Sequence, residues 1–303
     1  MKPRSNLKNM SKDISNPIKL IKDFGLEITN PKLTVIIVTW NRGNELIECL
    51  KGLEHQTDMQ FETIIVDNGN SNLYHYEGRD LKYIQLIRNF RPSFARNIGL
   101  RFVKARIVAF LDDDAVPDRW WVEKILASFK NNKIIALRGK IISKSAENIY
   151  NLMARHYDLG KVIIPSFISL EGNCAFDRDQ LLKVHGFDPQ VFGFEGLELT
   201  YRLIGNRKIH LSIYDPSVIV YHDYCDSFFH FLLKGIRHGK NGKNMKIQNH
   251  KLSEFERKYL NLQTGKKDVG LNLLLRLKLL FLKGIWLLTF SFGAFISKYS
   301  NFD

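Results

Sequence analysis

The chain has 303 residues, of which 45% are hydrophobic and 12% aromatic, and this composition excludes a disordered chain and suits one large or two small domains. The 45 lysines and arginines exceed the 31 aspartates and glutamates, and the net charge of +14 indicates an anionic partner. Three widely spaced cysteines argue against a disulfide scaffold, and no apolar run follows the basic first residues as a secretory signal would require.

The first half of the chain alternates between strand and helix patterns. Residues 1–30 form a polar leader, for which we expect partly helical structure around Pro17–Asp23. The β-branched run Leu33–Trp40 then predicts a strand buried on both faces, as in a parallel sheet. The elements expected next are a helix at Asn44–Leu53 with Asn44 as N-cap, strands at Phe61–Val66 and Lys82–Asn89, a helix at Pro92–Val103, a strand at Arg106–Leu111, a helix at Asp118–Asn131 and a strand at Ile134–Ser143. This alternation predicts an α/β domain with a mostly parallel central sheet and helices on both faces.

The pattern changes past residue 135. We expect a strand and turn with a Gly-Asn corner over Ser166–Asp177, and a helix at Glu198–Ile204 with Glu195 in or just before its first turn. A final strand pair is expected to end at His222.

Polar residues follow three of the predicted strands. Asn41 and Arg42 follow the first strand, the run 67–69 follows the second, and the aspartates 112–114 follow the strand that ends at Leu111. In an open α/β sheet, ligands bind outside the carboxyl ends of the strands. The sequence therefore predicts one polar ligand site at this edge of the sheet.

The segment Phe228–Lys298 combines positive charge with a strongly apolar end. It holds 14 lysines and arginines against 3 acidic residues, which favours contact with an anionic bilayer surface over a nucleic acid. The alternative is a buried terminal helix with lysines at its edges. Within Val269–Tyr299, the uninterrupted apolar part Ile285–Ile296 is shorter than the roughly 20 residues that span a bilayer, so a helix lying in the interface is favoured over a spanning one.

Eight short motifs occur along the chain in an order and spacing that resemble the family 2 glycosyltransferases of the GT-A fold. The motifs are VIIVTWNR, IIVDNGNSN, ARNIGL, VAFLDDDAVP, EGNCAFDRD, GFDPQVF, EGLELTYRL and VIVYH, and the resemblance covers roughly Leu33–Gly242. Members of this family transfer a sugar from a nucleotide-sugar. The resemblance implies a glycosyltransferase domain at 31–245, between the leader at 1–30 and a basic, apolar helical extension at 246–303.

The resemblance also implies a metal and donor site. It identifies residues 112–114 as the Asp-X-Asp motif and implies Mn²⁺ or Mg²⁺ held by Asp114, Asp112 and His222. A cation on such carboxylates neutralises a diphosphate leaving group. The residues that it assigns to a UDP-, dTDP- or GDP-sugar are Thr39, Trp40, Asn41, Arg42, Asp67, Asn68, Arg96, Asp112, Asp113 and Arg237. Trp40 is expected to stack on the base, with a place in the core as the alternative, and Arg237 is expected on a glycine-rich loop over the diphosphate.

The acceptor side departs from the family pattern. The family usually places Glu-Asp at the position of Glu195 and Gly196, with the aspartate as general base. Glu195 is therefore the predicted base of an inverting reaction, and Glu198 is the second candidate. The alternative roles of Glu198 are to stabilise the helix start or to pair with Arg202 four residues on. Gly172 and Asn173 are expected to contact the acceptor.

These expectations together describe an enzyme of cell-surface polysaccharide or glycoconjugate synthesis. It would glycosylate a glycan or lipid-linked acceptor, peripherally at the cytoplasmic face of an anionic membrane, with no nucleic-acid partner. The alternative is a non-catalytic nucleotide-sugar or glycan-binding module, against which the retained Asp-X-Asp motif argues. A dinucleotide-dependent oxidoreductase is disfavoured because no G-x-G-x-x-G follows the first strand.

Overall fold

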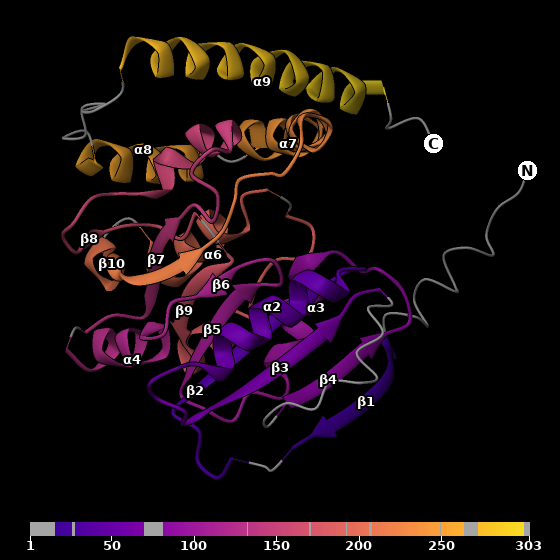
Figure 1. The fold of residues 1–303 in the computed structure, drawn as a ribbon, viewed down its shortest axis with the longest axis vertical. Helices are drawn as coiled ribbons and strands as arrows, with labels where there is room; N and C mark the ends of the chain where they lie inside the picture. Colours follow the sequence, from indigo (N-terminus) through magenta and orange to yellow (C-terminus); the bar gives the residue numbers. More distant parts are fainter. Residues whose placement is uncertain are drawn as a thin grey trace, which may run out of the picture.

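The computed structural model describes residues 16–25, 28–69, 81–131, 133–169, 171–191, 193–205, 208–248, 250–263 and 272–299. One mixed sheet runs through these residues in the order β1-β4-β3-β2-β5-β9-β7-β10-β6, with β8 paired to β10 (Figure 1). The strands are β1 (Ile18–Phe24), β2 (Leu33–Thr39), β3 (Phe61–Asp67), β4 (Leu81–Leu86), β5 (Ile107–Asp112), β6 (Val116–Pro117), β7 (Ala136–Ile142), β8 (Ile164–Pro165), β9 (Asn173–Asp177) and β10 (Ser212–Tyr221). The helices are α2 (Gly43–Glu54), α3 (Pro92–Leu100), α4 (Trp121–Asn131), α5 (Arg178–Lys183), α6 (Glu195–Ile204), α7 (Phe228–Gln248), α8 (His250–Gln263) and α9 (Leu273–Tyr299), with short 3₁₀ turns η1 (Ile149–Tyr157) and η2 (Ile209–Leu211).

The parallel strands β4, β3, β2 and β5 form the part of the sheet that positions the predicted site. Thr39 at the end of β2 lies opposite Asp67 at the end of β3, and Val38 lies opposite Asp112 at the end of β5. The antiparallel strand β9 pairs with β5 and places Asn173 opposite Leu111. The predicted convergence of strand ends at one edge of the sheet is confirmed.

Helices cover both faces of the sheet, as the alternation predicted. On one face, α2 and α4 pack Leu50 and Trp121 into a cluster that includes Val35 of β2. On the other face, Ile98 of α3 joins a cluster with Ile36, the neighbour of Val35 on the same strand, and with residues of α5 and α6. Successive β2 side chains point to opposite faces, so the apolar run of β2 is buried on both sides.

The second half of the predicted leader is an edge strand rather than a helix. In β1, half-buried Ile18, Leu20 and Phe24 alternate with exposed residues, and the strand pairs antiparallel with β4. The expected helix around Pro17–Asp23 was wrong because a period of two fits a half-buried strand. Lys19 and Asp23 lie on its exposed side and protect the open edge against further pairing. Residues 1–15 lie outside the described residues.

Three further elements differ from the expectations. Helix α2 begins at Gly43 after Arg42, which gives no side-chain cap, so Asn44 lies inside the first turn. The expected strand pair before His222 is the single strand β10, whose register against β7 shifts between Tyr214 and Ile219. The glycine-rich segment expected as a loop is part of helix α7, which runs through the predicted domain boundary at residue 245.

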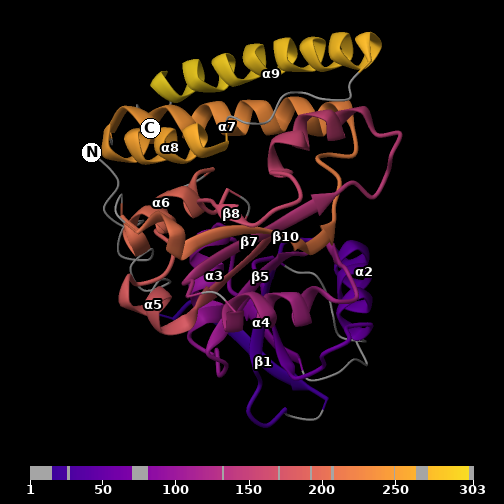
Figure 2. The same cartoon turned by 90° about the vertical axis from the view of Figure 1, so that its left-hand side faces the viewer.

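The glycines of α7 serve helix packing. Helix α9 packs against α7, and Figure 2 shows the two helices running side by side. A Cβ added to Gly239 would lie 1.9 Å from the carbonyl oxygen of Phe290, and one added to Gly293 would lie 2.1 Å from that of Ile236. The two backbones therefore touch, as in helix pairs that join through small residues. This contact attaches α9 to the rest of the domain.

We expect Gly239→Ala and Gly284→Ala to change stability in opposite directions. Alanine at Gly239 forces α7 and α9 apart, at about 1–3 kcal/mol of unfolding free energy for an overpacked contact. At Gly284 of α9 an added Cβ meets nothing within 4 Å, so alanine gains up to about 1 kcal/mol from helix propensity. Thermal melting of both variants checks this, and equal shifts would contradict the packing.

Candidate active site

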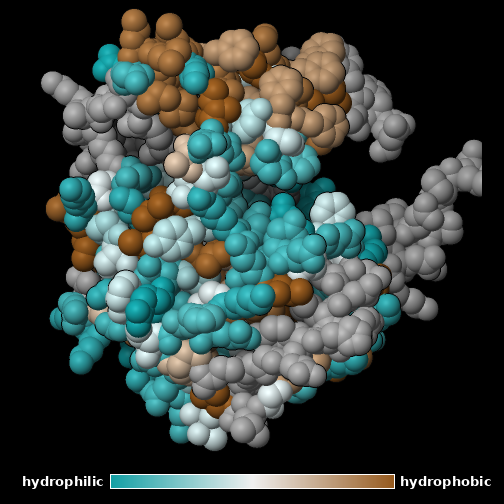
Figure 3. Space-filling model, in the orientation of Figure 1, coloured by the Kyte–Doolittle hydropathy of each residue, from teal (hydrophilic) through white to brown (hydrophobic). Residues whose placement is uncertain are grey.

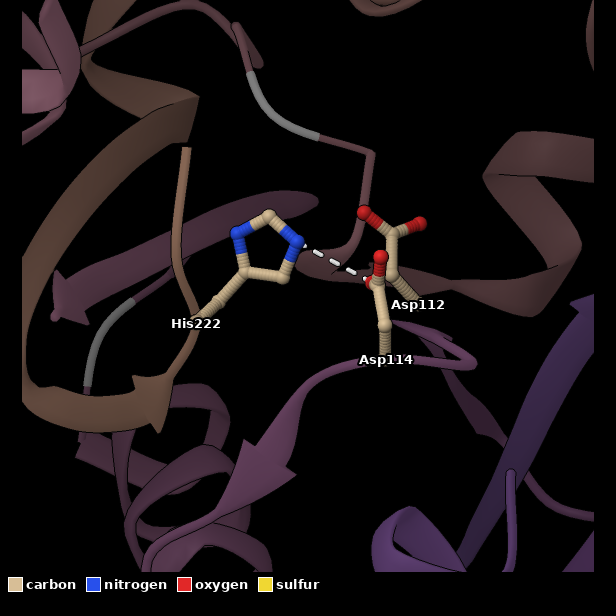
Figure 4. A group of neighbouring side chains, drawn as sticks. All are labelled: Asp112, Asp114 and His222. Atoms are coloured by element: carbon tan, nitrogen blue, oxygen red, sulfur yellow. Dashed lines mark ion pairs between the residues drawn. The ribbon is translucent and has the colours of Figure 1, made fainter. Parts of the chain in front are cut away.

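Two aspartates and a histidine form a group suited to a divalent cation. Asp112 ends β5 and Asp114 lies in the turn after it, while His222 follows β10, which pairs antiparallel with the short strand β6. The ligand atoms of the three side chains lie within 4.8 Å of one another, and His222 Nε2 is 3.0 Å from Asp114 Oδ1. Figure 4 shows the three side chains facing one another. Carboxylate oxygens with one imidazole suit Mn²⁺, and carboxylates suit Mg²⁺, so the residues fit the predicted metal.

Two arginines partly neutralise these acids. Arg42 contacts Asp114 and lies 3.2 Å from Asp113 Oδ1, while Arg96 lies 3.8 Å from Asp112. Burial raises the pKa of Asp113 to about 7, with the charge of Asp114 adding to the effect and Arg42 opposing it. Burial would also raise the pKa of Asp114, but the hydrogen bond from His222 and the charge of Arg42 hold it below its ordinary value. Asp114 therefore stays a carboxylate at neutral pH.

Helix α7 brings two cations toward this group. Lys234 and Arg237 lie three residues apart on one side of the helix. Lys234 Nζ donates to the carbonyl of Tyr224 at 2.7 Å, and burial lowers its pKa. Desolvation and the nearby positive charge of Arg42 lower the pKa of Arg237. The carboxylate of Glu195 acts on Arg237 in the opposite sense to Arg42, so Arg237 lies among charges of both signs.

The side chain of Trp40 lies over the turn after β3. It is 58% exposed, so the alternative that placed Trp40 in the core was wrong. A Cβ added to Gly69 would lie 2.5 Å from Trp40 Cδ1, so only glycine fits beneath the indole without movement. The backbone of the neighbouring Asn41 has a positive φ of 56°. The hydroxyl of Thr39 donates a hydrogen bond to the carboxylate of Asp113. The indole is an open face on which a base can stack.

Asp67 and Asn68 serve the protein itself in this structure. Asp67 is completely buried and accepts hydrogen bonds from the Gly69 N–H at 2.9 Å and from the Tyr83 hydroxyl. Asn68 is 2% exposed, donates to Asn89 Oδ1 and accepts from the N–H of residue 90. Both side chains hold the turns around the site, and their contact with a base stays a prediction.

The Gly-Asn corner divides into one residue at the site and one in the core. Asn173 is fully buried, accepts from Trp121 Nε1 at 2.8 Å and donates to the carbonyls of Lys140 and Val218. These partners hold the amide of Asn173 in the core, and its contact with the acceptor stays a prediction. Gly172 does lie at the site, because its carbonyl accepts the N–H of Asp112 at 3.3 Å.

We expect Gly172→Ala to weaken metal binding strongly. An added Cβ would lie 1.9 Å from Asp112 Oδ2, so the carboxylate must leave its present position. Isothermal titration in the presence of nucleoside diphosphate is expected to show at least about a tenfold loss of affinity for Mn²⁺. Losses of this size are typical when a residue that orients a metal ligand is changed. An unchanged affinity would show that the Asp112 carboxylate moves at no cost to the metal site.

Three glutamates surround the start of α6. Glu195 is 7% exposed and accepts the Gly193 N–H at 2.7 Å. Glu198 forms a two-point pair with Arg202 at 2.5 and 2.7 Å, which confirms the expected pairing, while its place as the second candidate base stays a prediction. Glu171, which the sequence analysis did not single out, accepts the Gly196 N–H at 2.6 Å. The only signal in the sequence was an acidic residue directly before the Gly-Asn corner.

The sequence comparison decides the family. The profile described as "Glycosyl transferase family 2" matches residues 34–186, which is half of the chain. The chain belongs to glycosyl transferase family 2. The pre-mycofactocin glycosyltransferase of Mycobacterium tuberculosis is 28% identical over 211 residues, covering 63% of this chain and 43% of that protein. The chondroitin synthase of Pasteurella multocida is 27% identical, covering 60% of this chain and 24% of that protein. The chain thus spans less than half the length of these relatives.

Solved structures place this family-2 chain in the GT-A fold. The mannosyltransferase PcManGT of Pyrobaculum calidifontis, in complex with GDP-Man and Mn²⁺, superposes with a TM-score of 0.56 at 15% identity and covers 95% of this chain and 93% of that one. TarS 1–349 of S. aureus in complex with UDP-GlcNAc superposes with a TM-score of 0.51 at 15% identity, covering 85% and 81%. The mostly parallel central sheet with flanking helices matches the fold expected from the sequence.

Proposed function

We propose that this family-2 chain transfers a glycosyl group from a nucleoside diphosphate sugar to an acceptor hydroxyl, with inversion at the anomeric carbon. The observation that carries the proposal is the group Asp112, Asp114 and His222, which lies next to the cation Arg42 and within reach of the charge of Lys234 on α7. Carboxylates hold a cation, and the cation and arginines together hold a diphosphate. The named complexes of the similar structures with GDP-Man and UDP-GlcNAc support a nucleotide-sugar donor.

The residues of the site have separate tasks in this reaction. Trp40 offers a stacking face to the base, while Arg42, Arg96 and Arg237 face the negative charge that develops on the diphosphate as the sugar leaves. Asp112, Asp114 and His222 would hold Mn²⁺ or Mg²⁺, which supplies Lewis-acid stabilisation of the same oxygens when bound. A carboxylate beside the start of α6 accepts the proton of the attacking hydroxyl.

A donor screen tests this function. The full chain with Mn²⁺ is mixed with UDP-, dTDP- and GDP-sugars, and its melting temperature is measured, followed by release of nucleoside diphosphate. We expect one nucleotide class to stabilise the protein by about 2.7 kcal/mol at 100 times its dissociation constant, and to be turned over. Binding without release, in the presence of glycan and lipid-linked acceptors, would favour the non-catalytic alternative. No response to any nucleotide would contradict both.

We further propose that α9 lies flat on an anionic membrane. The stretch Leu273–Ser297 is long and apolar enough to cross a bilayer by length and composition. One side of α9 packs on α7 through Gly293, however, while the opposite side exposes large apolar residues. These are Leu273, Leu274, Leu277, Leu280, Phe281, Leu287, Leu288, Phe292 and Phe295. Figure 3 shows hydrophobic residues gathered over this part of the molecule.

The charges on α9 support this orientation. At 3.6 residues per turn, Arg276 and Lys283 fall along one border of the apolar side and Lys278 along the other. Such flanking cations reach lipid headgroups when the apolar side is immersed. A spanning arrangement would instead require α9 to leave α7. The proposal places the chain peripherally at the cytoplasmic face, where anionic lipids and nucleotide-sugars meet.

The proposed acceptor follows from this placement. Lys234 and Arg237 of the donor site and the contacts to α9 lie on the same helix, α7. The donor site is therefore one helix away from the proposed membrane surface. This position favours a lipid-linked or growing surface glycan over a freely diffusing acceptor.

A further inference from the structure

The three glutamates near the start of α6 differ in their freedom to take a proton. Glu198 is neutralised by the two-point pair with Arg202. Glu195 is buried, with one oxygen on the Gly193 N–H. Glu171 is half-buried as a whole residue, with one carboxylate oxygen on the Gly196 N–H and no arginine paired to it at two points as in Glu198.

The carboxylate of Glu171 occupies the space beside Gly196. The residue before α6, Phe194, provides no side-chain cap, and the Gly196 N–H donates instead to Glu171 Oε1 at 2.6 Å. A Cβ added to Gly196 would lie 2.7 Å from this oxygen and 2.5 Å from the carbonyl oxygen of Ile168. No side chain fits at 196 without movement of the backbone. A carboxylate from the loop before β9 thus lies where a side chain from α6 would otherwise extend.

Glu171 also lies next to the metal group. The following residue, Gly172, is in contact with Asp112. Arg96, which is 3.8 Å from Asp112, is near enough to lower the pKa of Glu171. Burial, aided by the negative charge of Glu195, outweighs this arginine and raises the pKa of Glu171 to about 7. A carboxylate with a pKa near neutrality both accepts and releases a proton readily.

We propose that Glu171, in place of Glu195, is the general base that takes the proton of the acceptor hydroxyl. The proposal rests on the proposed glycosyl transfer. In the step, the acceptor oxygen forms a bond to the anomeric carbon, and the bond from that carbon to the diphosphate oxygen breaks with its electron pair going to the diphosphate. The hydroxyl proton moves to the carboxylate of Glu171. Glu195 acts through its charge on Glu171 and through the turn at Gly193.

The test compares Glu171→Gln with Glu195→Gln in the full chain. Each glutamine keeps a carbonyl oxygen for its backbone N–H partner, so each variant keeps the local hydrogen bond. The assay is release of nucleoside diphosphate from the donor found in the screen, with water in the place of the acceptor hydroxyl. We expect E171Q to lose turnover by about 10²-fold or more and to keep the donor affinity and melting temperature of the wild type. We expect the fold-loss of turnover in E195Q to be less than a tenth of the fold-loss in E171Q.

The outcomes separate the base from a purely capping role. A cap predicts that E171A is destabilised while E171Q keeps full turnover, and that result would overturn the proposal. A loss in E195Q that equals or exceeds the loss in E171Q would also overturn it, while leaving glycosyl transfer itself intact. A wild-type chain that binds and consumes no nucleotide-sugar would overturn the proposed function and the base together. E171D, which keeps a carboxylate, is expected to retain more turnover than E171Q.

Discussion

Asp114→Ala is expected to reduce nucleotide-sugar turnover by about 10²–10³-fold or more, the scale of losing one main electrostatic stabiliser of developing charge. Asp114 faces both Asp112 and His222, so its removal takes away the centre of the predicted metal group. The substitution also leaves Arg42 without its closest carboxylate. Release of nucleoside diphosphate, measured over a range of Mn²⁺ concentrations, reports the loss.

A matched substitution separates this effect from general damage. Asp179 lies on the surface of α5, where its side chain is 61% exposed beside Arg178, and surface pairs of this kind contribute little. Asp179→Ala is expected to keep wild-type turnover and metal dependence. Full activity of Asp114→Ala, or full wild-type activity in excess chelator, would contradict a metal-dependent site at these residues.

The triple variant Leu280→Gln, Leu287→Gln and Leu288→Gln is expected to lose membrane binding by more than about 100-fold. These side chains are 64%, 64% and 73% exposed on the outward side of α9. Immersion of a leucine side chain contributes about 1.5–3 kcal/mol, so three amides in their place remove about 4.5 kcal/mol or more of the apolar contribution, enough for a loss above about 100-fold. Co-sedimentation with vesicles of phosphatidylglycerol and phosphatidylcholine measures the change, and turnover of soluble donor is expected to stay intact.

The control replaces exposed apolar residues elsewhere by glutamine, at Ile47, Val162 and Leu182. This variant is expected to bind vesicles like the wild type. Binding of the wild type should also fall as salt rises, because screening weakens the attraction of Arg276, Lys278 and Lys283 to anionic headgroups. A wild-type chain that does not bind these vesicles would contradict the membrane proposal. A wild-type chain that neither high salt nor carbonate releases from the membrane would indicate a spanning helix.

The sheet could be predicted from the sequence because it depends on local patterns, whereas the ligand set of the metal group came from the resemblance to the family. The apolar run of β2 and the aspartates after β5 fix where each strand ends, and parallel pairing then brings the ends together. Asp112 and Asp114 therefore meet as expected. The edge strand β1 could not be assigned in this way, because its short alternation of lysines and apolar residues becomes a strand only through pairing with β4.

The parts that could not be predicted depend on contacts between distant segments. Glu171 lies 25 residues before Gly196, and only their hydrogen bond reveals that the two share one space. The glycines of α7 resemble loop residues until the backbone of α9 is placed against Gly239. Asn173 belongs to a motif of the family, yet its side-chain amide hydrogen-bonds Trp121 and two backbone carbonyls. Sequence patterns locate such residues but do not give their partners.

The most direct measurement is the anomalous scattering of manganese in crystals of the full chain grown with Mn²⁺ and a nucleoside diphosphate. We predict one strong peak about 2.1 Å from carboxylate oxygens of Asp112 or Asp114, within reach of His222 Nε2, with the diphosphate between the metal and Arg237. A well-ordered nucleotide with manganese bound away from these three residues, or with no manganese at all, would contradict it.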